Sequence, residues 1–182
     1  MQDQRKKILD AGLTILREQG LAGLTQPRIA AKTGLRQSHL TYYYPTRADL
    51  LTAVTRAAIE AQLAGARSLT TGIVSAEQAV AKMAIVVARR ENTRVLAALN
   101  QAADQEPPVR ALFNELLDGF IAELGSLLET LKLSPTEARI DLLHALFVGL
   151  SIIDLATRRK NGKVRAKATL SLAFDLLAGE KR

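Results

Sequence analysis

The side chains best able to do chemistry in this chain gather between residues 25 and 47. Elsewhere the catalytic residue types are sparse: there is no cysteine, and the two histidines, His39 and His144, are far apart in the sequence. No His-Glu-x-x-His motif, Gly-x-Ser-x-Gly motif or glycine-rich phosphate loop occurs. An enzyme would need a nucleophile, a metal cluster, an acid–base pair or such a loop. We therefore expect no catalytic residue, no metal site and no cofactor.

A run of hydrogen-bonding side chains follows Gly34, namely Gln37, Ser38 and His39. The basic residues around this run are Arg28, Lys32, Arg36 and Arg47. Side chains of these types can hydrogen-bond to base edges in the major groove of DNA and to the neighbouring phosphates. Gln37 is the best candidate for reading a base, because an amide can pair bidentately with adenine.

The distribution of charge also favours a polyanionic partner for the N-terminal end. The whole chain carries 25 basic and 18 acidic residues, a net charge of +7. Residues 1–50 hold eight of the basic and four of the acidic residues, and so contribute +4 of this total. DNA would suit that end, although an evenly solvated basic face has a similar composition. A second basic run, in residues 158–167, is interpreted as a solvated loop between helices.

Two short helices, expected over residues 26–33 and 36–43, must position the polar run. Gly34 lies between them, where the chain must turn sharply. Apolar residues recur at the spacing that would seat the second helix on the first: Ile29, Ala30, Leu35 and Leu40. The pattern predicts a helix-turn-helix with Gln37, Ser38, His39 and Tyr43 facing outward. An ordinary pair of packed helices is the alternative.

Helical periodicity extends over almost the whole chain, and no alternating strand pattern is found. The sequence therefore predicts an all-α fold. Thr25 and Thr46 are expected helix N-caps, and Ser134-Pro135-Thr136-Glu137 is expected to be a capping box with proline at the first helical position. The nine expected helices cover about 4–19, 26–33, 36–43, 46–69, 75–87, 93–104, 107–128, 135–158 and 164–178.

The segment GLAGLTQPRIAAKTGLRQSHLTYYYPTRADLL, residues 20–51, resembles the DNA-binding head of the TetR family of bacterial regulators. The matching elements are Gly20, Leu24-Thr25, Ile29-Ala30, Gly34-Leu35, Leu40 to Tyr44, Pro45, Thr46, Arg47 and Leu50-Leu51. The resemblance implies an N-terminal three-helix bundle with a helix-turn-helix, over residues 1–46. It also implies a helical regulatory and dimerisation domain over residues 47–182.

The resemblance assigns roles to matching positions of the head. Thr25 and Arg47 stand where the family contacts phosphates, and Tyr43 stands where an aromatic residue or histidine touches the backbone or a base. Thr41 departs from the usual tyrosine, and Pro27 cannot read a base with a side chain. The tyrosines 42–44 could instead serve packing. The full set of expected DNA-contacting residues is Thr25, Arg28, Arg36, Gln37, Ser38, His39, Tyr42, Tyr43 and Arg47.

The helix expected over residues 135–158 is apolar nearly all round, which exceeds what one buried stripe needs. Together with the helix over 164–178, it suits a homodimer interface, as the resemblance also implies. The family often binds a small-molecule effector in this domain. His144 is also explained as a core or interface histidine. The residues expected to line a pocket are Asn100, Phe113, Leu117, Phe120, His144 and Phe147.

These observations predict a sequence-specific DNA-binding transcriptional regulator, a repressor that a small-molecule ligand releases from double-stranded operator DNA. No stretch of about 18 uninterrupted apolar residues is present, and the N-terminus lacks an apolar export signal. We therefore expect a cytoplasmic protein with no membrane partner. A helical adaptor that binds only protein is the competing hypothesis, but it leaves the basic and polar surface near Gly34 unexplained.

Overall fold

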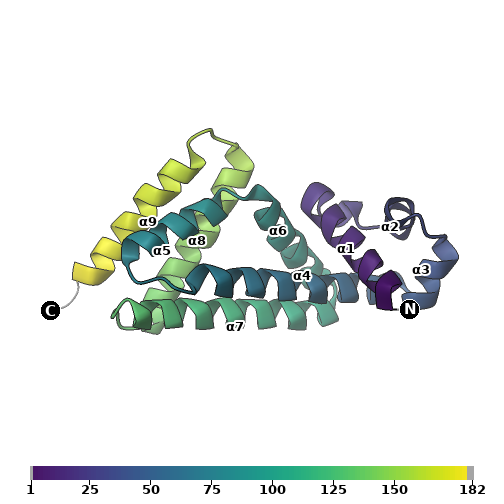
Figure 1. Ribbon diagram of the computed structural model, residues 1–182, viewed down its shortest axis with the longest axis horizontal. Helices are drawn as coiled ribbons and strands as arrows, with labels where there is room; N and C mark the ends of the chain where they lie inside the picture. The colour runs from purple at the N-terminus through teal and green to yellow at the C-terminus, as the bar shows by residue number, and fades with distance from the viewer. Residues whose placement is uncertain (1, 180–182) are drawn as a thin grey trace. The chain divides into compact units, whose positions relative to one another are not determined.

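The structure is a computed structural model that describes residues 2–179, and over these residues the chain is helical and contains no strand (Figure 1). The all-α fold and the nine α-helices expected from the sequence are confirmed for this range. The elements are α1 (Gln2–Gln19), the 3-10 helix η1 (Leu21–Gly23), α2 (Gln26–Thr33), α3 (Gln37–Tyr43), α4 (Arg47–Thr70), α5 (Ala76–Val87), α6 (Arg90–Gln105), α7 (Pro107–Thr130), α8 (Glu137–Thr157) and α9 (Gly162–Gly179).

The helices form two compact units. The first unit takes in the chain up to Gln62 together with residues 94–116. The second unit takes in residues 63–93 and the chain from Leu117 onward. Three helices, α4, α6 and α7, continue from one unit into the other. The domain boundary expected at residue 46 stays a prediction.

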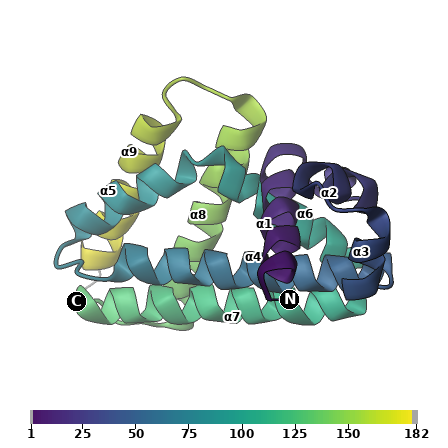
Figure 2. The ribbon, with the colours of Figure 1, turned by 45° about the vertical axis from the view of Figure 1, so that its right-hand side comes forward.

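In the first unit, α1, α2 and α3 pack into a small bundle (Figure 2). One face of α1 is fully buried through Ile8, Ile15 and Leu16. The helix ends at Gly20, whose φ of 70° is the left-handed conformation that favours glycine after a helix. Arg94 of α6 donates a hydrogen bond to the carbonyl of Arg17 near this end.

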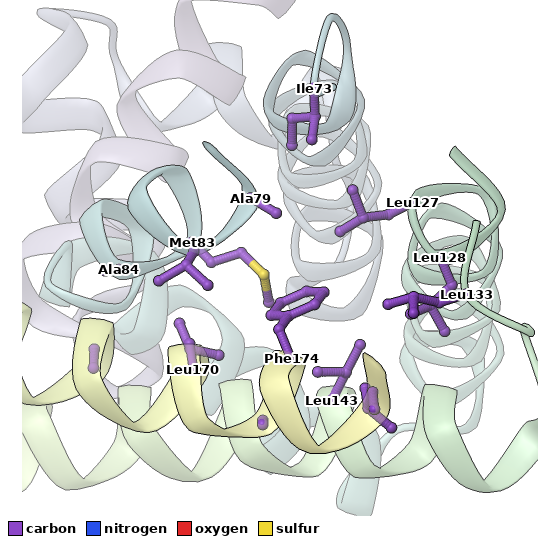
Figure 3. Packing of buried hydrophobic residues seen from close by; sticks show 14 of the residues in the cluster. Ile73, Ala79, Met83, Ala84, Leu127, Leu128, Leu133, Leu143, Leu170 and Phe174 are labelled. Carbon is purple, nitrogen blue, oxygen red and sulfur yellow. The ribbon is translucent and has the colours of Figure 1, made fainter. Parts of the chain in front are cut away.

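The second unit is built around α5, which packs on both α9 and α8. Figure 3 shows Met83 and Ala84 of α5 facing Leu170 and Phe174 of α9, with Leu143 of α8 beside them. Phe174 and Leu143 are essentially fully buried. Burying an apolar side chain of this size contributes roughly 1.5–3 kcal/mol to folding. This core fixes α8 and α9 as neighbours that share α5 on one side.

A buried ion pair holds the turn between α8 and α9. The Asp154 side chain is only 4% exposed, and its Oδ2 accepts a hydrogen bond from Nε of Arg90 at 2.8 Å. The same guanidinium donates to the carbonyl of Arg159, at 3.2 Å. A Cβ at Gly162 would collide with the Asp154 carboxylate. Glycine at this position therefore lets α9 begin directly beside the ion pair.

Helix α8 is the described helix that is long and apolar enough to cross a membrane by length and composition, with a mean hydropathy of 1.7. The same test is passed by core helices of soluble proteins. Here α8 packs on α5 and α9 and contributes Leu143, Ser151 and Asp154 to the interior of the second unit. Its apolar surplus lies on the outer face, where Leu142 and Ile153 are about half exposed.

Several helix ends differ from expectation. The capping box predicted at Ser134 is wrong: α8 begins at Glu137, Thr136 is the N-cap, and no side chain caps it. A residue before proline avoids helical angles, and here the extended backbone continues through Thr136, with φ −68° and ψ 151°. The last helix, expected from about residue 164, already begins at Gly162. The 3-10 helix η1 was not predicted.

Replacing Asp154 with alanine should lower the free energy of unfolding by about 2 kcal/mol, because the half-buried Arg90 guanidinium loses a charged hydrogen-bond partner. Urea unfolding at a fixed protein concentration measures this change. Asp118→Ala is the matched control, since Asp118 is an exposed aspartate on α7. Equal stabilities of the two variants would contradict the role assigned to the ion pair.

Candidate nucleic-acid interface

The turn between α2 and α3 depends on Gly34, which has φ 69° and ψ 14°. A side chain in this left-handed conformation costs roughly 1–2 kcal/mol, so glycine is favoured where the chain changes direction. On either side, Ile29 of α2 and Leu40 of α3 are fully buried. The amide of Gln26 also donates to the carbonyl of Tyr44 at 3.4 Å, which joins the start of α2 to the end of α3.

Helix α3 presents the predicted polar face to solvent. Leu40 is its one fully buried side chain, whereas Gln37, Ser38 and His39 are all exposed. Tyr42 is also exposed, to 71%. The expectation that side chains project outward is thus confirmed for Gln37, Ser38 and His39. Tyr43 differs from it, because it is half-buried and bonds to Gln4 of α1. The exposure of Tyr42 shows that packing does not explain this residue. Arg36 occupies the N-cap position without a side-chain capping bond, and it is exposed beside Gln37.

The start of α4 is fixed by a capping box. Thr46 Oγ1 accepts a hydrogen bond from the backbone N–H of Asp49 at 3.0 Å, and the Asp49 carboxylate accepts from the N–H of Thr46 at 3.0 Å. This confirms Thr46 as an N-cap. Arg47, the first residue of α4, is exposed, and it lines a small hollow with Leu24. Arg47 therefore lies near the start of α2, where Thr25 is the N-cap.

Two of the basic residues around the polar run already have partners on α1. Arg28 donates a hydrogen bond to the Gln19 side chain, and Lys32 forms an ion pair with Glu18 at 3.4 Å. Both pairs are exposed, so they would exchange for phosphate with little loss of stability. Thr25 is half-buried and is the N-cap residue of α2, as expected, but its side chain makes no capping hydrogen bond.

The N-terminal turn of α1 lies against the end of α3. The Arg5 guanidinium sits 5.6 Å from the centre of the Tyr43 ring, and the Tyr43 hydroxyl donates to Oε1 of Gln4 at 3.3 Å. Burial raises the pKa of Tyr44, and the charge of Arg5 opposes that shift. Sequence spacing could not reveal Arg5 or Gln4 as neighbours of α3, and the excess of positive charge near the N-terminus was the only signal.

The residues proposed for an effector pocket are distributed over both units. Asn100 is exposed on α6, and Phe113 is half-buried on α7, both in the first unit. The other four are half-buried in the second unit: Leu117, Phe120, His144 and Phe147. Ligand binding by these six residues stays a prediction.

The second unit brings two of them, Phe120 and His144, into contact. Their rings meet edge to face, with centroids 6.5 Å apart. Nε2 of His144 is buried and has no hydrogen-bond partner among the described residues. Burial lowers the pKa of His144 below its ordinary value of 6.5, and the nearby charge of Asp141 opposes that shift. A buried imidazole nitrogen without a partner is a polar group that a ligand could satisfy.

Comparison with known proteins shows that the head is similar to a known family. Residues 8–54 match the sequence model for bacterial regulatory proteins of the tetR family. This range includes α2, α3, the capping box of α4 and the whole polar surface described above. None of the curated proteins with which the chain was compared matches its sequence.

Solved structures extend the similarity of fold to the whole chain. A transcriptional regulator from Rhodococcus sp. Rha1 has a TM-score of 0.81 and 18% identity, covering 95% of each chain. A TetR transcription regulator from Haloarcula marismortui has a TM-score of 0.77 and 20% identity, covering 97% of this chain and 98% of the other. A candidate regulator from Saccharomonospora viridis, in complex with choline, has a TM-score of 0.81 and 17% identity, covering 94% and 95%. At these identities the likeness shows the fold alone.

Thr46→Ala should lower the free energy of unfolding by about 1 kcal/mol, because the first turn of α4 loses the hydroxyl that accepts from Asp49. Chemical denaturation measures the loss. Thr130→Ala is the control: its hydroxyl bonds only within its own helix, to the carbonyl of Ser126, and is exposed. A loss no larger than that of the control would show that the capping box does not fix the start of α4.

The lowered pKa of His144 predicts that the free energy of unfolding depends on pH. Its folded-state pKa is lowered, so below about pH 6.5 the unfolded chain takes up a proton that the folded chain does not. The free energy of unfolding should therefore decrease as the pH falls from 7, until the folded-state pKa is reached. His144→Gln should show a smaller decrease in thermal melts between pH 7 and 5.5. His39→Gln, on exposed α3, should keep the wild-type dependence. Parallel curves for His144→Gln and wild type would refute this account.

Proposed function

We propose that the chain is a sequence-specific, DNA-binding transcriptional regulator, and the premise is the match of residues 8–54 to the sequence model for bacterial regulatory proteins of the tetR family. The observation that carries the proposal is the exposure of Gln37, Ser38 and His39 on a helix held in place by the buried Leu40. A helix fixed from one side, with polar side chains on the other, can enter a major groove without rearranging its own packing.

The electrostatics of the head support a phosphate-contacting role. Arg36 and Arg47 are exposed at the starts of α3 and α4, and Arg36 directly precedes Gln37. Backbone N–H groups at a helix N-terminus and a neighbouring guanidinium both favour a phosphate oxygen. In this proposal Arg36, Arg47 and Thr25 position the head on the backbone, while Gln37 reads the sequence.

We further propose a homodimer that joins its subunits through α8 and α9. Both helices expose large apolar side chains, such as Ile152 on α8 and Leu172 on α9. Two heads in one dimer would contact two half-sites of a near-palindromic operator about one helical turn apart. The dimer would act in the cytoplasm, where operator DNA lies.

The second unit is the proposed place for a small-molecule effector that releases a repressor from DNA. The unpartnered Nε2 of His144 beside the Phe120 ring supports this assignment, since it offers one polar group among aromatic and apolar side chains. The structurally similar protein from Saccharomonospora viridis is in complex with choline, which supports a small ligand for this fold. A thermal-shift screen identifies ligands that raise the melting temperature of the wild type. If none of these ligands releases the wild type from its operator, the proposed release by an effector is wrong.

Operator DNA can be obtained by selecting bound duplexes from a random library, and two variants then test the roles in the head. Gln37→Ala should relax base preference at the position it reads, reducing discrimination by about 1–3 kcal/mol. Arg47→Ala should weaken binding to all DNA sequences alike. It should also make the plot of log binding constant against log salt concentration shallower by about one unit of slope. Mobility shifts over a series of salt concentrations measure both effects.

Arg56→Ala serves as the matched control, since Arg56 is exposed on α4 and lies outside the proposed contacts. It should change neither base preference nor the salt slope. If Gln37→Ala keeps the base preference of the wild type, Gln37 does not read the DNA sequence. Failure of the wild type to bind any selected duplex would overturn the regulator and favour an adaptor that binds only protein.

A further inference from the structure

Three side chains form a continuous row of contacts where the end of α3 meets the start of α1. The rings of Tyr42 and Tyr43 meet edge to face, with centroids 5.2 Å apart and planes at 81°. The Arg5 guanidinium lies over the Tyr43 ring, 5.6 Å from its centre. Tyr43 is half-buried, whereas Arg5 and Tyr42 are exposed. Tyr43 is therefore the packed member of the row, and the other two side chains face solvent.

The Tyr43 ring orders the Arg5 side chain. The negative face of an aromatic ring attracts a cation, and the planar guanidinium suits this contact. Gln4, the preceding residue of α1, accepts a hydrogen bond from the Tyr43 hydroxyl at 3.3 Å. The Arg5 charge also opposes the rise in pKa that burial gives Tyr44. These contacts hold the charge of Arg5 beside the last residues of α3.

The charge of Arg5 is ordered but not neutralised. No carboxylate among residues 2–179 forms an ion pair with it. Other cations of the head differ in this respect, because Arg28 donates to the Gln19 side chain and Lys32 pairs with Glu18. An aromatic ring attracts a cation without cancelling its charge. The charge of Arg5 therefore stays available to an anion outside the chain.

The position of Arg5 suits a DNA phosphate. Arg36 is exposed directly before α3, and Arg5 lies at the other end of the same helix. From Arg36 to Tyr43 the helix rises about 10 Å, at 1.5 Å per residue. This length is close to the width of the major groove, about 12 Å. With a cation at each end, α3 can contact phosphates on both sides of the bases that Gln37 would read.

We propose that Arg5 contacts a phosphate of the operator beside the end of α3, and that Tyr43 positions Arg5 instead of touching DNA itself. The inference rests on the proposed DNA-binding function and adds a contact from α1, outside the helix-turn-helix. It also changes the role of Tyr43, whose ring lies under Arg5 and whose hydroxyl is bonded to Gln4. Tyr43 acts by preorganisation, because a guanidinium that is already ordered loses less conformational entropy on binding.

Removal of the charge tests the phosphate contact, in mobility shifts with the selected operator duplex and with a scrambled duplex of equal length and composition. Arg5→Ala should weaken binding to both duplexes about ten-fold at about 0.1 M salt. The plot of log binding constant against log salt concentration should become shallower by about one unit of slope, because one phosphate keeps its counterion. The ratio of the two affinities should not change, since a phosphate contact carries no sequence information. A changed ratio would overturn the assignment to a phosphate.

Lys6→Ala is the matched control. Lys6 is the next residue of α1, is exposed and carries the same charge. At 100° per residue, it lies on the side of α1 opposite the fully buried Ile8. It should therefore keep nearly the wild-type affinity and slope. Equal losses in Lys6→Ala and Arg5→Ala would show that only the net charge of α1 matters, and would overturn the contact.

Two substitutions test the positioning role of Tyr43. Tyr43→Phe keeps the ring under Arg5 and removes only the hydroxyl, so it should bind nearly like the wild type. Tyr43→Leu removes the ring and should weaken binding roughly two- to ten-fold, the cost of ordering one side chain on binding. In a chain that also carries Arg5→Ala, Tyr43→Leu should cause no further loss. Additive losses, or a Tyr43→Phe variant as weak as Tyr43→Leu, would show that Tyr43 itself contacts DNA.

The outcome for Arg5 can be separated from the outcome for the proposed function. Melts followed by circular dichroism establish that each variant is folded at the temperature of the binding assay. If the wild type binds a selected duplex and Arg5→Ala binds it as tightly, the contact is wrong and the regulator stands. If the wild type binds no selected duplex, both the contact and the proposed function are wrong.

Discussion

The burial of Leu40 against α2 is the contact on which the proposed function depends. Helix α3 has only seven residues, so it cannot be stable by itself, and Leu40 is its one fully buried side chain. That contact and the left-handed turn at Gly34 set the rotation of α3 about its axis. A rotation by one residue, about 100°, would bring polar side chains inward and Leu40 out to solvent. The outward direction of Gln37, Ser38 and His39 is thus a consequence of one apolar contact.

Local sequence signals located the elements of the head accurately because each signal acts over a few residues. Gly34 marks the turn, the spacing of Ile29 and Leu40 identifies the packed faces, and Thr46 with Asp49 forms the capping box. The same reasoning failed for the start of α8, because the segment Ser134-Pro135-Thr136-Glu137 offers more than one possible N-cap. Local patterns identify a helix reliably, but the choice among adjacent caps depends on tertiary packing.

Contacts between residues distant in sequence were not predictable. Arg90 and Asp154 are 64 residues apart, and Arg5 and Tyr43 are 38 apart, so no periodicity relates them. A charged residue in an apolar helix, as Asp154 is in α8, signals that a partner exists but not which one. The effector residues have the same limit: Phe120 and Phe147 lie on apolar helix faces and are half-buried, and a core and a pocket share that composition.

The chain uses positive charge in two different ways. In the head, exposed arginines lie beside polar side chains, a combination that favours a hydrated polyanion whose counterions can be released. On α8 and α9, by contrast, exposed cations border large exposed apolar side chains. DNA offers no apolar surface to match such a face, so the two groups of cations suit partners of different chemistry.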